Sequence, residues 1–155
     1  ARRADRTRLT YDLWIASTIQ EEGGLIGADA LGRDYDLGIS LDVGPAGDVP
    51  GISPDEVPCR LGAGPVLVHK DSGIRYHKDL TYALAHAAEA EHIPIQHVSF
   101  QSFASDSAAL LKNGIPAALI CYPTRYTHSP IETVREEDLE AIVHLLGAFF
   151  ERGTF

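Results

Sequence analysis

Cysteine is scarce in this sequence, and the two cysteines present lie far apart. Cys59 and Cys121 are the only ones among 155 residues, and no Cys-x-x-Cys pair occurs. A zinc knuckle needs closely spaced cysteine pairs, and a disulfide framework needs several cysteines. The sequence therefore indicates neither kind of cysteine-stabilised fold.

Positive charge and long apolar runs are also lacking. Lys and Arg number 13 against 22 Asp and Glu, so the formal net charge is −9 at pH 7. Such an excess argues against nucleic acid or an anionic membrane as partner, and it is compatible with cation binding or simply with solubility. No apolar run is long enough to cross a membrane, and the basic start at residues 1–8 lacks the apolar segment of a signal peptide. We therefore expect a cytoplasmic protein.

What is present is enough chain for one domain. The hydrophobic content of 45% and charged content of 23% are ordinary for a globular protein, and 155 residues can bury a sizeable core. We find no internal repeat or linker, so we expect residues 1–155 to form a single domain.

Hydrophobic periodicity predicts strands that alternate with helices. Such alternation is typical of an α/β domain, here with a mainly parallel sheet and helices on both faces. The expected strands cover residues 11–20, 37–42, 64–69, 95–100 and 117–122. The expected helices cover residues 25–31 and 78–91, a stretch from the bend at 102–107 to 113–114, and a final segment with apolar residues at 139, 142, 143, 146, 149 and 150.

Two adjacent carboxylates, Glu21 and Glu22, follow the first predicted strand and precede Gly23 and Gly24. Along a regular strand they would point to opposite faces, but the glycines allow the backbone to turn both toward one place. A metal-dependent hydrolase uses such a pair, because one carboxylate binds the metal and the other stays free to accept a proton from water. The alternative is an acidic helix N-terminus, which the helix dipole favours.

Two further candidates follow predicted strands. Asp42 closes the second strand, and His128 lies in the loop after the strand that ends near residue 122. Ligands of α/β proteins gather beyond the carboxyl ends of the strands, so we expect Glu22, Asp42 and His128 to converge there with Glu21. Singly, Asp42 could be a turn residue and His128 a solvated side chain. The triplets His69-Lys70-Asp71 and His77-Lys78-Asp79 are set aside, because neither follows a strand directed at this edge.

Five segments, in this order, carry a resemblance to a known family. They are Thr18-Ile19-Gln20-Glu21-Glu22-Gly23-Gly24-Leu25, Leu41-Asp42-Val43, Ala46-Gly47-Asp48-Val49-Pro50-Gly51, Leu61-Gly62-Ala63-Gly64-Pro65 and Arg125-Tyr126-Thr127-His128-Ser129-Pro130. From about Thr10 onward the chain resembles the carboxyl-terminal half of the catalytic domain of the tetrahedral aminopeptidases. This is the glutamyl-aminopeptidase-like group of dinuclear metallopeptidases, some of whose members are labelled cellulases or endoglucanases.

The resemblance implies a role for each matching position. Glu21 matches the general base, Glu22 and His128 match ligands of one metal, and Asp42 matches a ligand of the other. Arg125 and Tyr126 match a region of substrate contacts. The implied reaction is removal of amino-terminal residues from peptides by a water shared between two divalent ions, which we expect to be zinc or cobalt.

The bend at residues 104–107 stands where relatives often carry Gly-Gly-Thr-Asp-Ala. We expect Asp106, in this bend, to cap the helix that follows.

Part of the family's pattern is absent. A His-x-Asp motif and a bridging aspartate lie far upstream of the Glu-Glu strand in the family, as does an inserted dimerisation domain, and only about ten residues stand upstream here. We therefore expect a partial enzyme that is inactive in isolation and whose full-length form is a homo-oligomer. Two alternatives stay open: a glycosidase with paired carboxylates, and an inactive relative that serves as a binding or assembly partner.

Overall fold

A four-stranded mixed sheet forms the centre of the computed structural model, which describes residues 7–152. The strands are β1 (Gly38–Pro45), β2 (Val66–Lys70), β3 (Gln96–Ser99) and β4 (Ala117–Thr124), in the order β1-β4-β2-β3. β1 pairs with β4 and β2 with β3 in parallel, while β2 and β4 are antiparallel. Two of the three pairings are thus parallel, as the sequence predicted.

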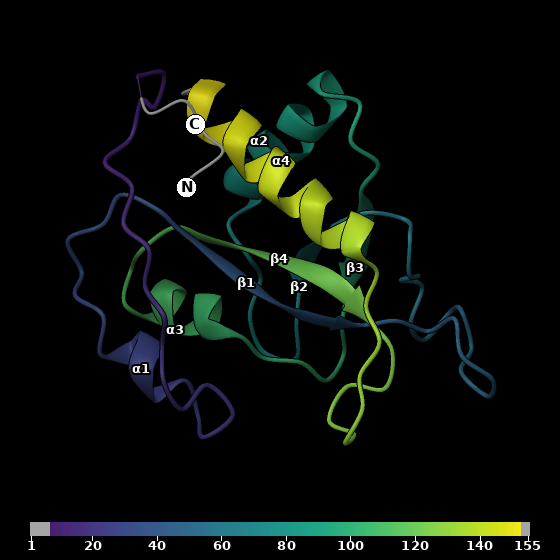
Figure 1. The fold of residues 1–155 in the computed structure, drawn as a ribbon. Helices are drawn as coiled ribbons and strands as arrows, with labels where there is room; N and C mark the ends of the chain where they lie inside the picture. The colour runs from purple at the N-terminus through teal and green to yellow at the C-terminus, as the bar shows by residue number, and fades with distance from the viewer. Residues whose placement is uncertain (1–6, 153–155) are drawn as a thin grey trace.

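Helices cover both faces of this sheet. They are α1 (Ile26–Asp29), α2 (Lys78–Ala90), α3 (Asp106–Lys112) and α4 (Glu136–Arg152). Figure 1 shows α2 and α4 above the sheet and α1 and α3 below it. The predicted α/β fold with helices on both faces is confirmed.

Alternation along the central strand β4 creates a separate core on each face. Ala118 and Ile120 belong to the cluster that α2 and α4 cover, whereas Leu119 and Cys121 belong to the cluster on the other face. Successive side chains of a strand point to opposite faces, so a strand covered on both sides must be apolar throughout. Cys121 and Cys59 are buried free thiols in the lower cluster, in agreement with the absence of a disulfide framework.

The strand predicted over residues 11–20 is not observed. The segment is extended but belongs to no strand, and Trp14 and Ile15 are 76% and 75% exposed. It is held near its start, where the Thr10 amide donates to Phe150 O at 3.5 Å and Tyr11 stacks on Phe149. Because the described residues offer this segment no neighbouring strand, its apolar character alone does not make it one.

Among the described residues, no helix has the length and apolar character needed to cross a membrane.

One buried carboxylate joins α4 to the loop that precedes β2. Asp138 is 2% exposed, and it accepts hydrogen bonds from the amides of Gly62 at 2.8 Å and Gly64 at 2.9 Å. Gly64 has φ +87°, and a Cβ there would lie 2.0 Å from the Pro94 carbonyl oxygen. Asp138 therefore holds a tight turn that only glycine can form.

Replacing Asp138 by Ala should lower the free energy of unfolding by about 1–3 kcal/mol, because two amides lose their acceptor. Glu136→Ala, an exposed position in the same helical turn, should change it by less than about 0.5 kcal/mol. Urea unfolding of both variants measures this, and equal losses would contradict the structural role of Asp138.

Candidate metal centre

The two adjacent glutamates lie in a turn rather than at a strand end. The Glu21 carbonyl accepts hydrogen bonds from the amides of Gly24 at 3.1 Å and Leu25 at 2.9 Å. Gln20 and Gly24 take positive φ values of +54° and +106°, so the chain reverses around the pair. The turn leads directly into α1 and presents Glu21 half-buried and Glu22 exposed.

A hydrogen bond ties this turn to α3. The Thr18 hydroxyl donates to Oδ2 of Asp106, the first residue of that helix, at 2.5 Å. Oδ1 of Asp106 is buried and has no hydrogen-bond partner among residues 7–152. The expectation that Asp106 caps the helix is wrong: residue 105 holds the cap position, and the Asp106 carboxylate binds Thr18 instead.

Asp42 faces the same end of α3. It lies within β1, opposite Cys121 of β4, and does not close its strand as expected. Ser40, two residues earlier on the same face, contacts the Ser107 hydroxyl at 2.7 Å, which places this face of β1 over the start of α3. Asp42 Oδ1 accepts a hydrogen bond from the Val43 amide at 2.7 Å.

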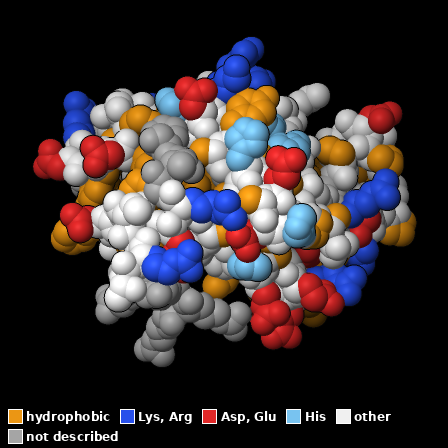
Figure 2. All heavy atoms as spheres, turned by 90° about the horizontal axis from the view of Figure 1, so that it is seen from above, with side chains coloured by type: hydrophobic (Ala, Val, Ile, Leu, Met, Phe, Trp, Pro, Cys, Tyr) orange, Lys and Arg blue, Asp and Glu red, His pale blue; other side chains and the backbone are white. Residues whose placement is uncertain are grey.

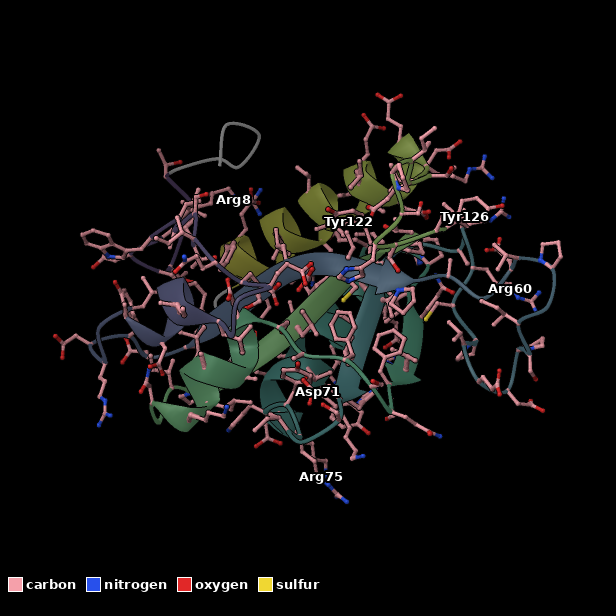
Figure 3. The ribbon with its side chains drawn as sticks, turned by 90° about the horizontal axis from the view of Figure 1, so that it is seen from below. Arg8, Arg60, Asp71, Arg75, Tyr122 and Tyr126 are labelled. Carbon is pink, nitrogen blue, oxygen red and sulfur yellow. The ribbon has the colours of Figure 1, made fainter. Side chains whose placement is uncertain are left out.

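The loop after β4 supplies the histidine. Paired hydrogen bonds between Arg125 and Thr133 close the loop, and Tyr126 and His128 both have φ +63°. The His128 amide donates to Glu132 Oε1 at 2.9 Å, and His128 Nε2 lies 3.7 Å from Glu22 Oε1. Glu22 and His128, from distant parts of the sequence, thus meet. Figure 3 shows Tyr126 on the same side of the molecule as Arg60, away from Arg8.

Arg125 is engaged elsewhere in the protein. Its guanidinium donates two hydrogen bonds to the Asp48 carboxylate, at 3.0 and 2.6 Å. This contact links the loop that carries His128 to the loop after β1. Tyr126 is 54% exposed, and its side chain makes no such hydrogen bond among the described residues.

Burial, together with crowded negative charge, raises two pKa values here. Partial burial, followed by the charges of Asp42, Glu22 and Asp106, raises the pKa of Glu21 to about 7, and His128 opposes this. Burial also raises the pKa of Asp42 to about 6, with the Val43 amide opposing it and Asp106 and Glu22 adding to it. These carboxylates therefore lack compensating positive charge.

The sequence-predicted residues gather in one region but form no complete ligand set. Within residues 7–152, no group of three or more His, Cys, Asp or Glu side chains could hold a metal ion. The Glu22–His128 contact, the uncompensated carboxylates and the unpartnered Asp106 oxygen do fit a nearby cation. Glu22 and His128 could provide two ligands to one ion, and Asp42 one ligand to another. Sequence reasoning missed the Thr18–Asp106 contact, which no local pattern signals.

The two His-x-Asp triplets have other roles. β2, which carries His69, runs antiparallel to β4, so its carboxyl end lies at the opposite edge of the sheet. Asp71 is buried and accepts hydrogen bonds from Tyr76 and from the amides of the turn that follows it. His77 holds the N-cap position of α2. Both triplets therefore lie away from the edge of the sheet at which β1 and β4 end.

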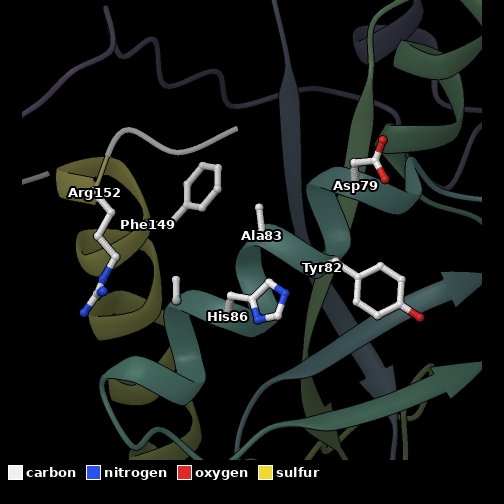
Figure 4. A pocket seen from close by; sticks show the side chains of 7 residues that line it. Asp79, Tyr82, Ala83, His86, Phe149 and Arg152 are labelled. Carbon is white, nitrogen blue, oxygen red and sulfur yellow. The ribbon is translucent and has the colours of Figure 1, made fainter.

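A hollow lies between helices α2 and α4. It measures about 310 Å³ and is lined by Tyr82 and His86 of α2 and by Phe149 and Arg152 of α4 (Figure 4). Figure 2 shows this face from above, with acidic, basic and histidine side chains interspersed. The sheet separates it from the Glu21 turn, so it forms no part of the candidate centre.

The sequence profile of the M42 glutamyl aminopeptidase family matches residues 1–145. A protein of Acetivibrio thermocellus is 37% identical over 139 residues, which are 87% of this chain and 42% of that protein. The lysyl aminopeptidase of Pyrococcus furiosus is 31% identical over 145 residues, which are 90% of this chain and 40% of that protein.

Solved structures show the same similarity. The TET aminopeptidase of a marine sediment thaumarchaeon matches 90% of this chain and 40% of its own, with 32% identity and a TM-score of 0.85. The TET1 peptidase of Pyrococcus horikoshii, described as assembling into a tetrahedron or a large octahedral shell, matches 86% of this chain and 39% of its own, with 30% identity and a TM-score of 0.72. The chain thus spans about 40% of the length of these relatives.

The Arg125–Asp48 contact predicts a pH-dependent contribution to stability. The hydrogen bond from Arg125 holds the pKa of Asp48 below its ordinary value. The contribution of this contact to the free energy of unfolding is therefore present above the unfolded-state pKa of about 4, and it is lost as pH falls through the folded-state pKa. Asp48→Asn should lower the melting temperature at pH 7, and the difference from the unmodified protein should shrink below about pH 4.

Asp55→Asn is the matched control, because Asp55 is exposed on the same loop. It should leave the melting temperature unchanged over this range. A difference for Asp48→Asn that stays constant down to the lowest pH at which the protein folds would contradict the ion pair.

Proposed function

Because the chain belongs to the M42 glutamyl aminopeptidase family, we propose that the protein it represents is a metal-dependent aminopeptidase whose centre includes Glu21, Glu22, Asp42 and His128. The observation that carries this proposal is the 3.7 Å approach of Glu22 and His128 beside the half-buried Glu21. The chain spans about 40% of its relatives, so the activity is proposed for a longer polypeptide.

Each residue has a defined task in this proposal. Glu22 and His128 would hold one divalent ion, and Asp42 would hold a second; a mixed carboxylate and imidazole set suits zinc or cobalt. When bound, such ions would supply Lewis acidity and lower the pKa of a bound water. Glu21 binds no metal and accepts the proton of the attacking water, then returns it to the leaving amine.

The surroundings of Glu21 support its role as base. A carboxylate transfers protons best when its pKa lies near the working pH, and burial with neighbouring acids raises that of Glu21 to about 7. Glu22, by contrast, is exposed and has His128 beside it, as a metal ligand should. The adjacent glutamates therefore differ in environment, which suits two different tasks.

Two further assignments belong to the same proposal. Tyr126, which is exposed beside His128, contacts the peptide, and Arg125 acts mainly by holding this loop through Asp48. The longer protein is a homo-oligomer, a proposal supported by the tetrahedral and octahedral assemblies named for the P. horikoshii relative. A cytoplasmic location remains a prediction.

Metal dependence separates this proposal from its rivals. A glycosidase with two carboxyl groups flanking a sugar needs no metal, so a chelator would leave it active, whereas it should abolish the proposed peptidase. An inactive binding protein would hydrolyse neither substrate.

In the longer protein, Glu21→Gln should reduce turnover of an unblocked peptide by at least about 100-fold, because the proton acceptor is lost. Its metal content should stay the same. Glu22→Gln is the matched control at the adjacent position, and it should lose both metal and activity. Elemental analysis measures the metal content. Hydrolysis of peptides with free and with acetylated amino termini measures the turnover. Metal loss in Glu21→Gln with retention in Glu22→Gln would reverse the assignment.

The 155-residue chain alone should bind cobalt weakly and hydrolyse no peptide, because catalytic ions normally need three protein ligands. His128→Ala should reduce this binding further, whereas His86→Ala, an exposed histidine on α2, should not. Calorimetric titration with cobalt chloride measures both. Equal binding by His128→Ala and the unmodified chain, or a peptidase rate for the chain alone, would contradict this account.

A further inference from the structure

Two histidines that lie apart in the sequence meet where β2 and β3 run side by side. His69 Nε2 lies 2.8 Å from His97 Nδ1, and the centroids of the two rings are 5.0 Å apart. His97 is exposed, and His69 is half-buried. The candidate metal centre uses neither residue. The Asp71 carboxylate, which ends the triplet that His69 begins, is bound to Tyr76 and to the turn that follows it.

The pairing of β2 with β3 produces this contact. Leu67 lies opposite His97, and the register then shifts at His69, which is an extra residue in the ladder. A bulge of this kind redirects the side chain that it carries. Leu67 faces the core that α2 and α4 cover, and the His69 ring lies 6.1 Å from the Tyr82 ring of α2. Figure 4 shows Tyr82 at the end of the hollow away from Arg152, so the histidine pair borders that end.

The two facing nitrogens share one proton. A neutral imidazole has one N–H and one lone pair, so one of the two nitrogens donates and the other accepts. Burial, followed by the neighbouring His97, lowers the pKa of His69, so a second proton on the pair is disfavoured at neutral pH. The pair therefore offers neutral imidazole rings, which is the form that binds metal ions.

The separation of the facing nitrogens suits one class of ion. Imidazole nitrogens bind transition ions at about 2.0 Å. Two adjacent ligands of a square ion therefore lie roughly 2.8 Å apart, whereas two ligands of a tetrahedral ion lie roughly 3.3 Å apart. Square or tetragonal coordination is typical of Cu²⁺ and Ni²⁺, and Cu²⁺ binds most tightly of the divalent first-row ions. The observed separation of 2.8 Å therefore favours copper over zinc.

We propose that His69 Nε2 and His97 Nδ1 form a Cu²⁺ site, separate from the candidate metal centre, in which water molecules complete the coordination. When the ion binds, the proton between the rings moves to the far nitrogen of the ring that carries it. Both facing nitrogens then present a lone pair, and no proton is lost. The exposed His97 ring turns so that the two lone pairs meet at the ion. Because both ligands are imidazoles, Mg²⁺ and Ca²⁺, which prefer oxygen, do not compete.

Copper titration followed by electron paramagnetic resonance tests this proposal in solution. The protein carries His128→Ala, so that the candidate metal centre lacks its histidine. One Cu²⁺ per chain should bind, with a signal split by two nitrogen ligands. His69→Gln and His97→Gln should each weaken binding by at least about tenfold, because one of two protein ligands is lost. His86→Gln is the matched control, an exposed histidine of α2, and it should bind copper as before.

Binding that neither His69→Gln nor His97→Gln weakens, or a signal split by a single nitrogen, would overturn the proposal. Zinc chloride should bind to the same protein at least about tenfold more weakly than copper chloride. Equal affinity for the two ions would contradict the square geometry on which the choice of copper rests.

Anomalous diffraction at the copper edge gives a readout that needs no variant. Crystals of the unmodified protein soaked in copper chloride should show a peak within bonding distance of both His69 Nε2 and His97 Nδ1. A peak bound by only one of these nitrogens, or none between them, would show that the pair is a hydrogen-bonded contact and not a metal site.

Discussion

The parallel pairing of β1 with β4 is the constraint on which the candidate centre depends. Its register runs without a break from Gly38 opposite Ala117 to Pro45 opposite Thr124. Both strands therefore end at the same edge of the sheet, and the loops that carry Asp48 and His128 leave side by side and are joined through Arg125. The same register directs Asp42 toward the start of α3. A shift by one residue would turn Asp42 to the opposite face and dismantle the centre.

The second feature of the site is uncompensated charge. Burial raises the pKa of both Glu21 and Asp42, and the charges of Glu22 and Asp106 raise both further, while His128 opposes the rise. Proteins seldom retain crowded carboxylates without a proton, a cation or a hydrogen-bond donor to compensate them. The Thr18 hydroxyl compensates only one oxygen of Asp106. This balance supports a cation-binding centre independently of family membership.

Much of the fold could be predicted from periodicity, because strands β1 to β4 and helices α2 and α4 each bury a face with a regular apolar pattern. Residues 11–20 were predicted wrongly, because a strand forms only beside a neighbouring strand. The sequence of the segment itself does not show whether such a neighbour is present. The meeting of Glu22 with His128 was anticipated from strand ends and family resemblance. The Thr18–Asp106 and Arg125–Asp48 contacts were not, because each joins side chains whose proximity is set by packing alone.

Anomalous diffraction from cobalt-loaded crystals of the longer protein tests the central claim most directly. Our account predicts one peak within bonding distance of Glu22 and His128, a second beside Asp42, and a Glu21 carboxylate that coordinates neither ion. An ion bound by Glu21, or ions bound away from Glu22, Asp42 and His128, would contradict it.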